Sequence, residues 1–123
     1  MYVLDQPDNL TTMFEESVRT FPNNQIFGTK NSHGVYEWIT YAQVGEMVDA
    51  LRGGLASLGV GKGDAVGIIA NNRTEWAVAC YASYGLGARY VPMYEAELET
   101  MWRYIIQDSS VKGLFVWKRE IFD

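Results

Sequence analysis

The sequence predicts an α/β fold: a three-layer parallel βαβαβ unit preceded by a small antiparallel hairpin. Three observations predict it. Residues 65–70 form a short apolar run without alternation, which is typical of a strand covered on both faces. Two further strand-like runs follow at residues 89–93 and 113–117. Segments with helical spacing separate the three runs, so we expect parallel strands joined by right-handed crossovers.

The first element expected along the chain is a helix from Thr12 to Phe21. Phe14, Val18 and Phe21 would share one face of it, and Thr12 with Glu15 fits a capping box. The segment Pro22-Asn23-Asn24 provides the stop signal.

A hairpin is expected next. Residues 25–30 and 35–40 have the composition of strands, and the turn-forming segment Asn31-Ser32-His33-Gly34 connects them. A loop this short favours antiparallel pairing.

The second helix, residues 41–58, is the clearest element. Thr40 and Gln43 fit a capping box, and Gly59 stands where a left-handed residue ends a helix. Spacings of four and three residues place one apolar stripe on a single face: Val44, Val48, Leu51, Leu55 and Leu58.

A third helix is expected from Arg73 to about Leu86, with Asn72 and Glu75 as its cap. Small residues along it would allow close approach to a sheet. Its expected buried side is Trp76, Ala79, Cys80 and either Ser83 or Tyr84.

A fourth helix is expected from Leu98 to Asp108, after a strand in which Pro92 indicates a position near a sheet edge. Its expected inward residues are Leu98, Met101 or Trp102, Ile105 and Ile106.

Composition limits the class of protein. The 123 residues make one domain or part of one, and 48% hydrophobic content excludes a disordered chain. No apolar run approaches the ~20 residues of a membrane span, and the first residues do not resemble a secretory signal.

The single Cys80 favours a reducing, cytoplasmic setting. A net charge of −5 without a basic stripe argues against nucleic acid as a partner.

Candidate catalytic motifs are weak. The glycines of residues 59–64 lack the spacing of a phosphate-binding loop or a dinucleotide fingerprint and are interpreted as a turn. His33 is interpreted as a loop residue and Cys80 as a core residue, and one Cys with one His is too few ligands for a zinc site. Glu95, Glu97 and Glu99 are interpreted as charges that favour a helix start. We therefore assign no catalytic, cofactor-binding or metal-binding residue.

The fold itself indicates where a ligand would bind. Ligands of open parallel sheets bind at the carboxyl ends of the strands. Here those ends are residues 70–72, 92–94 and 117–118.

The order and spacing of several segments resemble the adenylate-forming, AMP-binding acyl-CoA synthetases, most closely the long-chain fatty acid–CoA ligases. The resemblance extends over nearly the whole chain from Leu10. The segments that carry it are Trp38 to Tyr41, Leu55 to Ile68, Asn71 to Trp76, Gly87 to Tyr94 and Tyr104 to Ser109.

The resemblance implies that residues 1–123 are a partial N-terminal α/β subdomain of an AMP-binding domain. It implies an enzyme that uses ATP, Mg²⁺ and coenzyme A to convert a fatty acid into an acyl-adenylate and then a thioester. The family's phosphate-binding loop and its other adenylation motifs are absent from this sequence. We therefore expect the fragment alone to be inactive and to have little or no fatty acid affinity.

Two alternatives remain open. In the first, the chain is a free-standing module that binds acyl chains or a partner protein. In the second, it is a structural partner of a separately encoded remainder of the enzyme. A cytoplasmic location, with possible peripheral membrane association of the parent protein, is expected. The apolar strand 113–117 has no following neighbour, so we also expect self-association through an open sheet edge.

Overall fold

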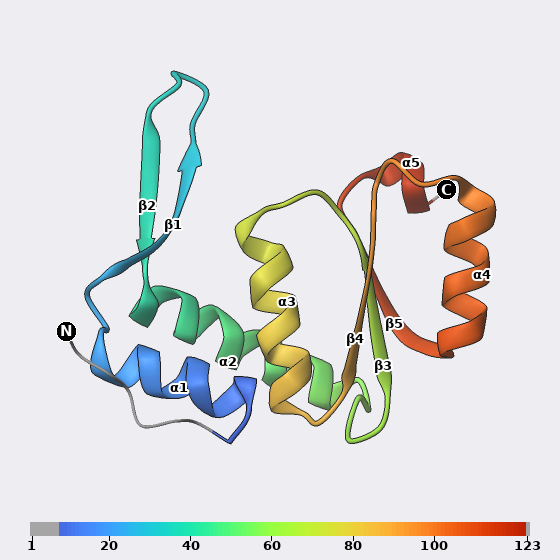
Figure 1. The fold of residues 1–123 in the computed structure, drawn as a ribbon, viewed down its shortest axis with the longest axis horizontal. Coiled ribbons are helices and arrows are strands. Elements are labelled where there is room, and N and C mark those ends of the chain that lie inside the picture. The colour runs from blue at the N-terminus through green and yellow to red at the C-terminus, as the bar shows by residue number, and fades with distance from the viewer. Residues whose placement is uncertain (1–7, 123) are drawn as a thin grey trace.

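A computed structural model describes residues 8–122 and confirms the mixed α/β class (Figure 1). Its elements follow the expected order. They are α1 (Leu10–Thr20), β1 (Gln25–Lys30), β2 (Tyr36–Thr40), α2 (Tyr41–Ser57), β3 (Ala65–Ile69), α3 (Thr74–Gly85), β4 (Arg89–Met93), α4 (Glu99–Ser109), β5 (Val111–Val116) and α5 (Arg119–Phe122).

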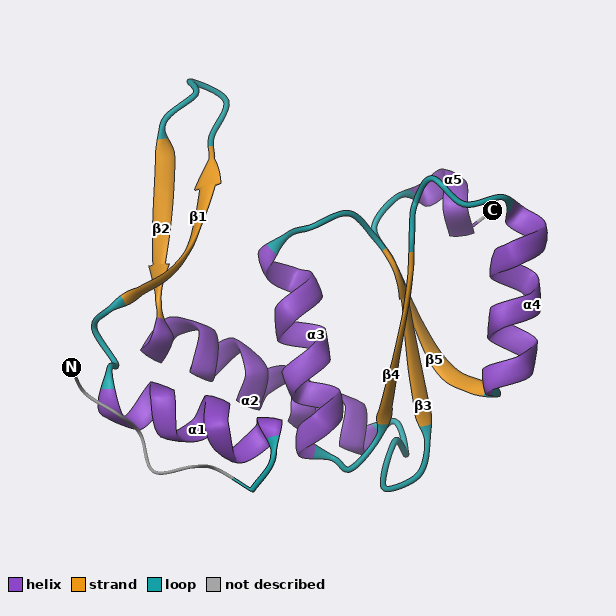
Figure 2. Ribbon diagram, in the orientation of Figure 1, coloured by secondary structure: helices purple, strands orange, loops and turns teal. Residues whose placement is uncertain are grey.

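The strands form two separate sheets (Figure 2). β1 and β2 pair antiparallel, as the hairpin prediction requires. β3 pairs in parallel with both β4 and β5, which gives the order β4-β3-β5. The βαβαβ prediction is therefore confirmed, and Pro92 lies in an edge strand of the described sheet.

The parallel sheet lies between two helical layers, with α3 on one side and α4 on the other (Figure 1). All five residues of β3 are buried, as its continuous apolar sequence predicts. Val66 and Ile68 pack with the core beneath α2 and α3. On the opposite face, Gly67 leaves room for the side chains of Leu114 and Met93.

α2 begins with the predicted capping box. The Gln43 amide donates to Oγ1 of Thr40 at 3.2 Å, and the Thr40 amide donates to Oε1 of Gln43 at 2.9 Å. Val44, Val48 and Leu55 are buried, but Leu58 is 78% exposed. The prediction for Leu58 was wrong because the helix ends at Ser57, and the chain turns away before Gly59 at φ +88°.

α1 starts earlier than the predicted Thr12. Asn9 is the N-cap, and its Oδ1 accepts a 2.8 Å hydrogen bond from the Thr12 amide. The Thr12–Glu15 capping box was wrong because Asn9 caps equally well one turn upstream. Phe14, which the sequence predicts on the inner face of this helix, is buried. Its ring stacks on that of Tyr81, with the ring centroids 4.2 Å apart.

α3 begins at Thr74, and Arg73 rather than Asn72 is its N-cap, without a side-chain cap hydrogen bond. The predicted Asn72–Glu75 cap was wrong because the Glu75 carboxylate instead accepts from Arg73 Nε at 2.8 Å. Within the expected inner face, Ala79, Cys80 and Ser83 are buried, whereas Trp76 and Tyr84 are half-buried.

α4 is less buried than its apolar spacing suggests. Leu98 and Met101 are exposed, which contradicts the prediction, and Trp102, Ile105 and Ile106 are half-buried. Trp102 turns its indole back to the preceding loop, where Nε1 donates to the Tyr94 carbonyl at 2.8 Å. α4 therefore covers its face of the parallel sheet without burying any of its own residues fully.

The β1–β2 hairpin projects away from the helices (Figure 1). Trp38 lies directly over Gly28, where a Cβ atom would meet the indole ring at 2.8 Å. Tyr36 continues this aromatic face, with its ring centroid 6.1 Å from that of Trp38. Gly28 is therefore required by close packing and not by a turn.

Candidate functional site

The carboxyl ends of the parallel strands meet at one edge of the sheet, as the sequence predicts. β4 lies on one side of β3 and β5 on the other, and the crossover helices α3 and α4 cover opposite faces (Figure 1). The strand connections therefore change direction between β3 and β5. In open α/β sheets this switch point is where ligands bind.

Trp117, the first residue after β5, is the centre of this edge. Its Nε1 donates a 2.9 Å hydrogen bond to Oε2 of Glu95, in the loop after β4. The Arg73 guanidinium, in the loop after β3, lies 4.5 Å from the ring centroid, and Lys118 Nζ lies 5.1 Å from it. One indole thus joins the loops that follow all three strands.

The charged groups around Trp117 are paired. Lys118 Nζ lies 2.5 Å from Oε1 of Glu95, and Arg73 Nε lies 2.8 Å from Oε2 of Glu75. The hydrogen bond from Lys118, followed by that from Trp117, holds the pKa of Glu95 below its usual value. The hydrogen bond from Arg73 similarly lowers the pKa of Glu75.

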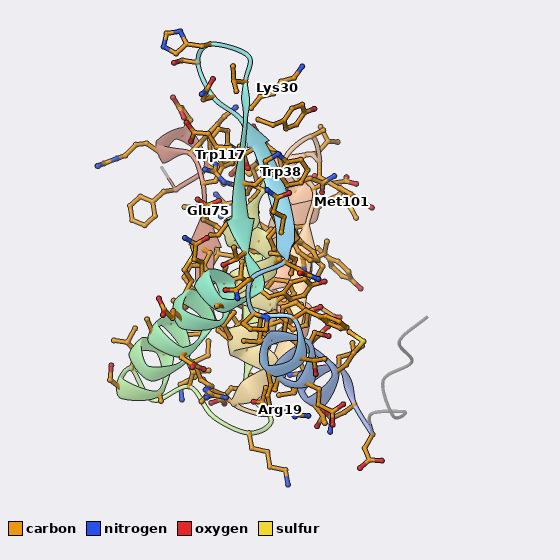
Figure 3. The ribbon with its side chains drawn as sticks, turned by 90° about the vertical axis from the view of Figure 1, so that its left-hand side faces the viewer. Arg19, Lys30, Trp38, Glu75, Met101 and Trp117 are labelled. Carbon is orange, nitrogen blue, oxygen red and sulfur yellow. The ribbon has the colours of Figure 1, made fainter. Side chains whose placement is uncertain are left out.

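An apolar groove of about 820 Å³ extends from this edge along the sheet face beside α2 and α3. Among the described residues, Arg73 and Glu75 are the only charged ones that line it, and they stand with Trp117 at the carboxyl edge. Figure 3 labels Glu75 and Trp117 in a view from the hairpin side. The apolar lining comes from α2, β3, α3 and β5: Met47, Ala50, Leu51, Ile68, Ala70, Val78, Ala79, Phe115, Val116 and Trp117.

This arrangement suits binding rather than proton transfer. Glu75 and Glu95 are held ionised by their cationic partners, so neither is suited to act as a general acid near neutral pH. The groove offers apolar contact area with one guanidinium at its end. Sequence reasoning placed residues 117–118 at this edge but gave them no role, and it missed Arg73, which lies in the loop after β3 at the same edge.

The glycine-rich segment is a structural turn, as interpreted from its spacing. Gly59 and Gly63 both have positive φ, and Asp64 Oδ2 accepts from the Gly61 amide at 2.8 Å. Lys112 Nζ, from β5, donates to the Gly59 carbonyl at 2.6 Å. The segment lies before β3, at the edge of the sheet opposite the groove's charged end.

His33 and Cys80 lie away from this edge. His33 is exposed in the hairpin loop, where its backbone amide donates to Oδ1 of Asn31 at 2.9 Å. Cys80 is a buried free thiol in α3, and burial raises its pKa. The structure thus places Cys80 in the core as interpreted.

The three neighbouring acids have different roles. Glu99 lies in the first turn of α4, as the dipole argument expects, and pairs with Arg103. Glu95 instead binds Trp117 and Lys118. Glu97 is exposed in the loop between them. The acids therefore do not converge on one site.

Within residues 8–122, no three His, Cys, Asp or Glu side chains are grouped so that they could hold a metal ion. Over the same residues, no helix is long and apolar enough to cross a membrane.

Comparison with known proteins connects this unit to a family. Residues 14–123 match the family described as AMP-binding enzyme. The chain is 30% identical to long chain acyl-CoA synthetase 2 of Arabidopsis thaliana, over 97% of this chain and 19% of the relative. It is 34% identical to a long-chain-fatty-acid–CoA ligase of Mycobacterium tuberculosis, over 93% of this chain and 19% of the relative. The chain thus spans about a fifth of the length of the curated relatives it matches.

Solved structures give the same result for the fold. The inhibitor-bound N-terminal domain of FACL13 from Mycobacterium tuberculosis matches with a TM-score of 0.78 and 27% identity, over 88% of this chain and 26% of that one. The N-terminal subdomain of NpsA from Klebsiella oxytoca, in complex with 3-hydroxyanthranilyl-AMSN, matches with a TM-score of 0.82 and 22% identity. That match covers 92% of this chain and 28% of the other.

Proposed function

The chain belongs to the AMP-binding enzyme family, and on that premise we propose that it is the N-terminal part of an ATP-dependent long-chain fatty acid–CoA ligase. The complete enzyme would form an acyl-adenylate and then an acyl-CoA thioester. The observation that supports this most is the family match over residues 14–123, together with relatives named as long-chain acyl-CoA synthetases.

Residues 1–123 would serve as part of the N-terminal α/β subdomain of the AMP-binding domain. ATP, Mg²⁺ and coenzyme A would be bound by polypeptide outside this stretch. One feature of the described residues supports this assignment. The glycine-rich segment is a turn in which the Gly61 amide donates to Asp64 and Lys112 donates to the Gly59 carbonyl, so these donors are already bound within the protein.

The proposal predicts that the 123-residue chain does not catalyse adenylation. Purified chain mixed with palmitate, ATP and Mg²⁺ should release no pyrophosphate above a protein-free blank. A full-length long-chain fatty acid–CoA ligase, assayed in parallel, provides the positive control. Pyrophosphate released in proportion to the 123-residue chain would contradict the proposal.

A second candidate is a free-standing module, derived from such an enzyme, that binds acyl chains or a partner protein. The apolar groove beside α2 and α3 favours it, because small-molecule sites are typically concave and mostly apolar. The mass of the protein in its native cells separates the two candidates. An immunoblot band near 13.9 kDa supports the module, whereas one about five times larger supports the ligase.

We also propose a cytoplasmic setting, which the free buried thiol of Cys80 supports. Peripheral association of the longer protein with membranes is compatible with this setting.

A further inference from the structure

The two outer strands of the parallel sheet, β4 and β5, differ in the backbone donors that they direct outward. In a parallel strand, every second residue directs its N–H and C=O groups to the same neighbour. The residues between them direct theirs to the other side, where an unpaired row is a template for a further strand. The partner that each edge accepts therefore depends on which residues face outward.

β4 directs Pro92 outward. The Arg89 amide donates to the Asp64 carbonyl, directly before β3, at 2.7 Å, and the register between β3 and β4 has no shift. Alternate residues from Arg89 onward therefore face β3, whereas Tyr90 and Pro92 face away. Proline has no N–H, so within this strand only Tyr90 directs a backbone donor outward.

β5 keeps its outward donors. The Trp117 amide donates to the Ile69 carbonyl of β3 at 3.3 Å, and the register between β3 and β5 is regular from Gly113 onward. Leu114 and Val116 therefore face away from β3. Within the described part of the chain, no other strand pairs with β5. β5 is thus the open edge of the sheet, and β4 is the closed one.

The lysines in and after β5 do not protect this open edge. Lysines commonly block pairing at sheet edges because their charge repels another strand. Here Lys112 Nζ lies 3.4 Å from Oδ2 of Asp64, and Lys118 is paired with Glu95. The open edge is therefore close to neutral, and local charge does not oppose the approach of a second β5.

We propose that two copies of the 123-residue chain join β5 to β5 as a closed dimer, and that Pro92 stops assembly at two copies. Antiparallel pairing across a twofold axis uses the same edge of both copies, so both open edges are consumed. The two ends of the joined sheet are then β4 edges, and each carries Pro92. With β4 open as well, further copies would add without limit. Dimerisation of this kind is independent of the proposed ligase function.

Variants that open or close each edge test the proposal. Sedimentation velocity of the wild-type chain, over a wide range of concentration, should show a species of twice 13.9 kDa and nothing larger. Val116→Pro removes an outward donor from β5 in each copy and should weaken dimerisation about tenfold or more. Pro92→Val restores an outward donor to β4 and should give assemblies that grow beyond the dimer with concentration.

Two further variants serve as controls. Pro22→Val also restores an N–H, but Pro22 lies before β1 and outside the parallel sheet, so this variant should remain dimeric. The double variant Pro92→Val with Val116→Pro opens one edge and closes the other, so it should form nothing larger than a dimer. Nonspecific aggregation caused by Pro92→Val would persist in the double variant and would overturn the proposal.

The fold of each variant is verified by circular dichroism. If Val116→Pro unfolds, Gly113→Lys replaces it in the single and double variants, because a side chain at Gly113 meets no atom within 4 Å. The lysine then closes β5 by its charge and not by loss of a donor.

Four results would overturn the proposal: a wild-type chain that stays monomeric, wild-type assemblies larger than a dimer, a Pro92→Val protein that remains dimeric, or a folded Val116→Pro protein that dimerises as the wild type does. Hydrogen exchange of the Leu114 and Val116 amides completes the test. We expect their exchange to slow as the chain dimerises. Slow exchange in a monomer would show that the chain covers its own edge, which also overturns the proposal.

Discussion

Trp117 donates its indole N–H to the carboxylate of Glu95, across 22 positions of sequence. The bond connects the loop after β5 with the loop after β4, and Lys118 adds a second connection by pairing with the same carboxylate. The carboxyl edge of the sheet is thus linked by side chains from the loops after two strands that do not pair with each other.

Replacing Glu95 by Gln should lower stability in a pH-dependent way. The folded protein holds the pKa of Glu95 below its usual value of 4.5. The contribution of the ionised form is therefore complete above that value and is lost as the pH falls through the folded-state pKa. Urea unfolding should show a difference between wild type and Glu95→Gln at pH 7 that shrinks toward pH 3. Glu97→Gln, in the same loop, is the control and should show no such trend.

Gly45 should tolerate alanine only if its neighbour is shortened. A Cβ atom at Gly45 would lie 2.9 Å from Cγ1 of Val18, across the contact between α1 and α2. Overpacking costs about 1–3 kcal/mol, more than the ~1 kcal/mol gained by placing alanine in a helix. Gly45→Ala should therefore destabilise the wild type by about 1 kcal/mol. In a Val18→Ala background the same change should stabilise, and a destabilisation there would contradict the packing argument.

The N-terminal cap of α2 should account for a measurable share of stability. Thr40→Ala removes the acceptor for the Gln43 amide and should lower the free energy of unfolding by about 1 kcal/mol. Thr40→Ser keeps the hydroxyl and should remain close to wild type in urea titration. Equal losses in both variants would mean that the threonine methyl group, not the cap, stabilises the helix.

The isolated chain should self-associate through the free edge of β5. Within residues 8–122, β5 pairs with β3 alone, and Leu114 is exposed on it. Exposed apolar edges pair with other chains. Sedimentation velocity should detect concentration-dependent oligomers, and Gly113→Lys should suppress them because a side chain there meets no atom within 4 Å. Gly61→Lys, which is equally unobstructed, should leave the oligomers unchanged.

Sequence reasoning predicted the topology well because its signals were local and strong. Thr40 and Gln43 lie three positions apart, and the uninterrupted apolar run of β3 reports burial on both faces. Failures arose where two residues offered the same signal. Asn9 and Thr12 are both competent caps, and only the packing of the helix decides between them.

Burial and the candidate site were harder to predict because they depend on distant segments. Leu98 and Met101 have correct helical spacing, yet α4 contacts too little of the sheet to bury them. Glu95 looked like a charge near a helix start, but its partners stand 22 and 23 positions later. The edge could be located from topology, whereas the pairing of its charges could not.

The position of β3 also has a consequence for biosynthesis. This strand is central in the sheet, but it leaves the ribosome before either of its neighbours. Its backbone N–H and C=O groups stay unpaired on one side until β4 has been made and on the other until β5 has been made. Nascent chains that pause in this interval expose an unpaired strand with apolar side chains, the kind of surface that aggregates unless a chaperone covers it.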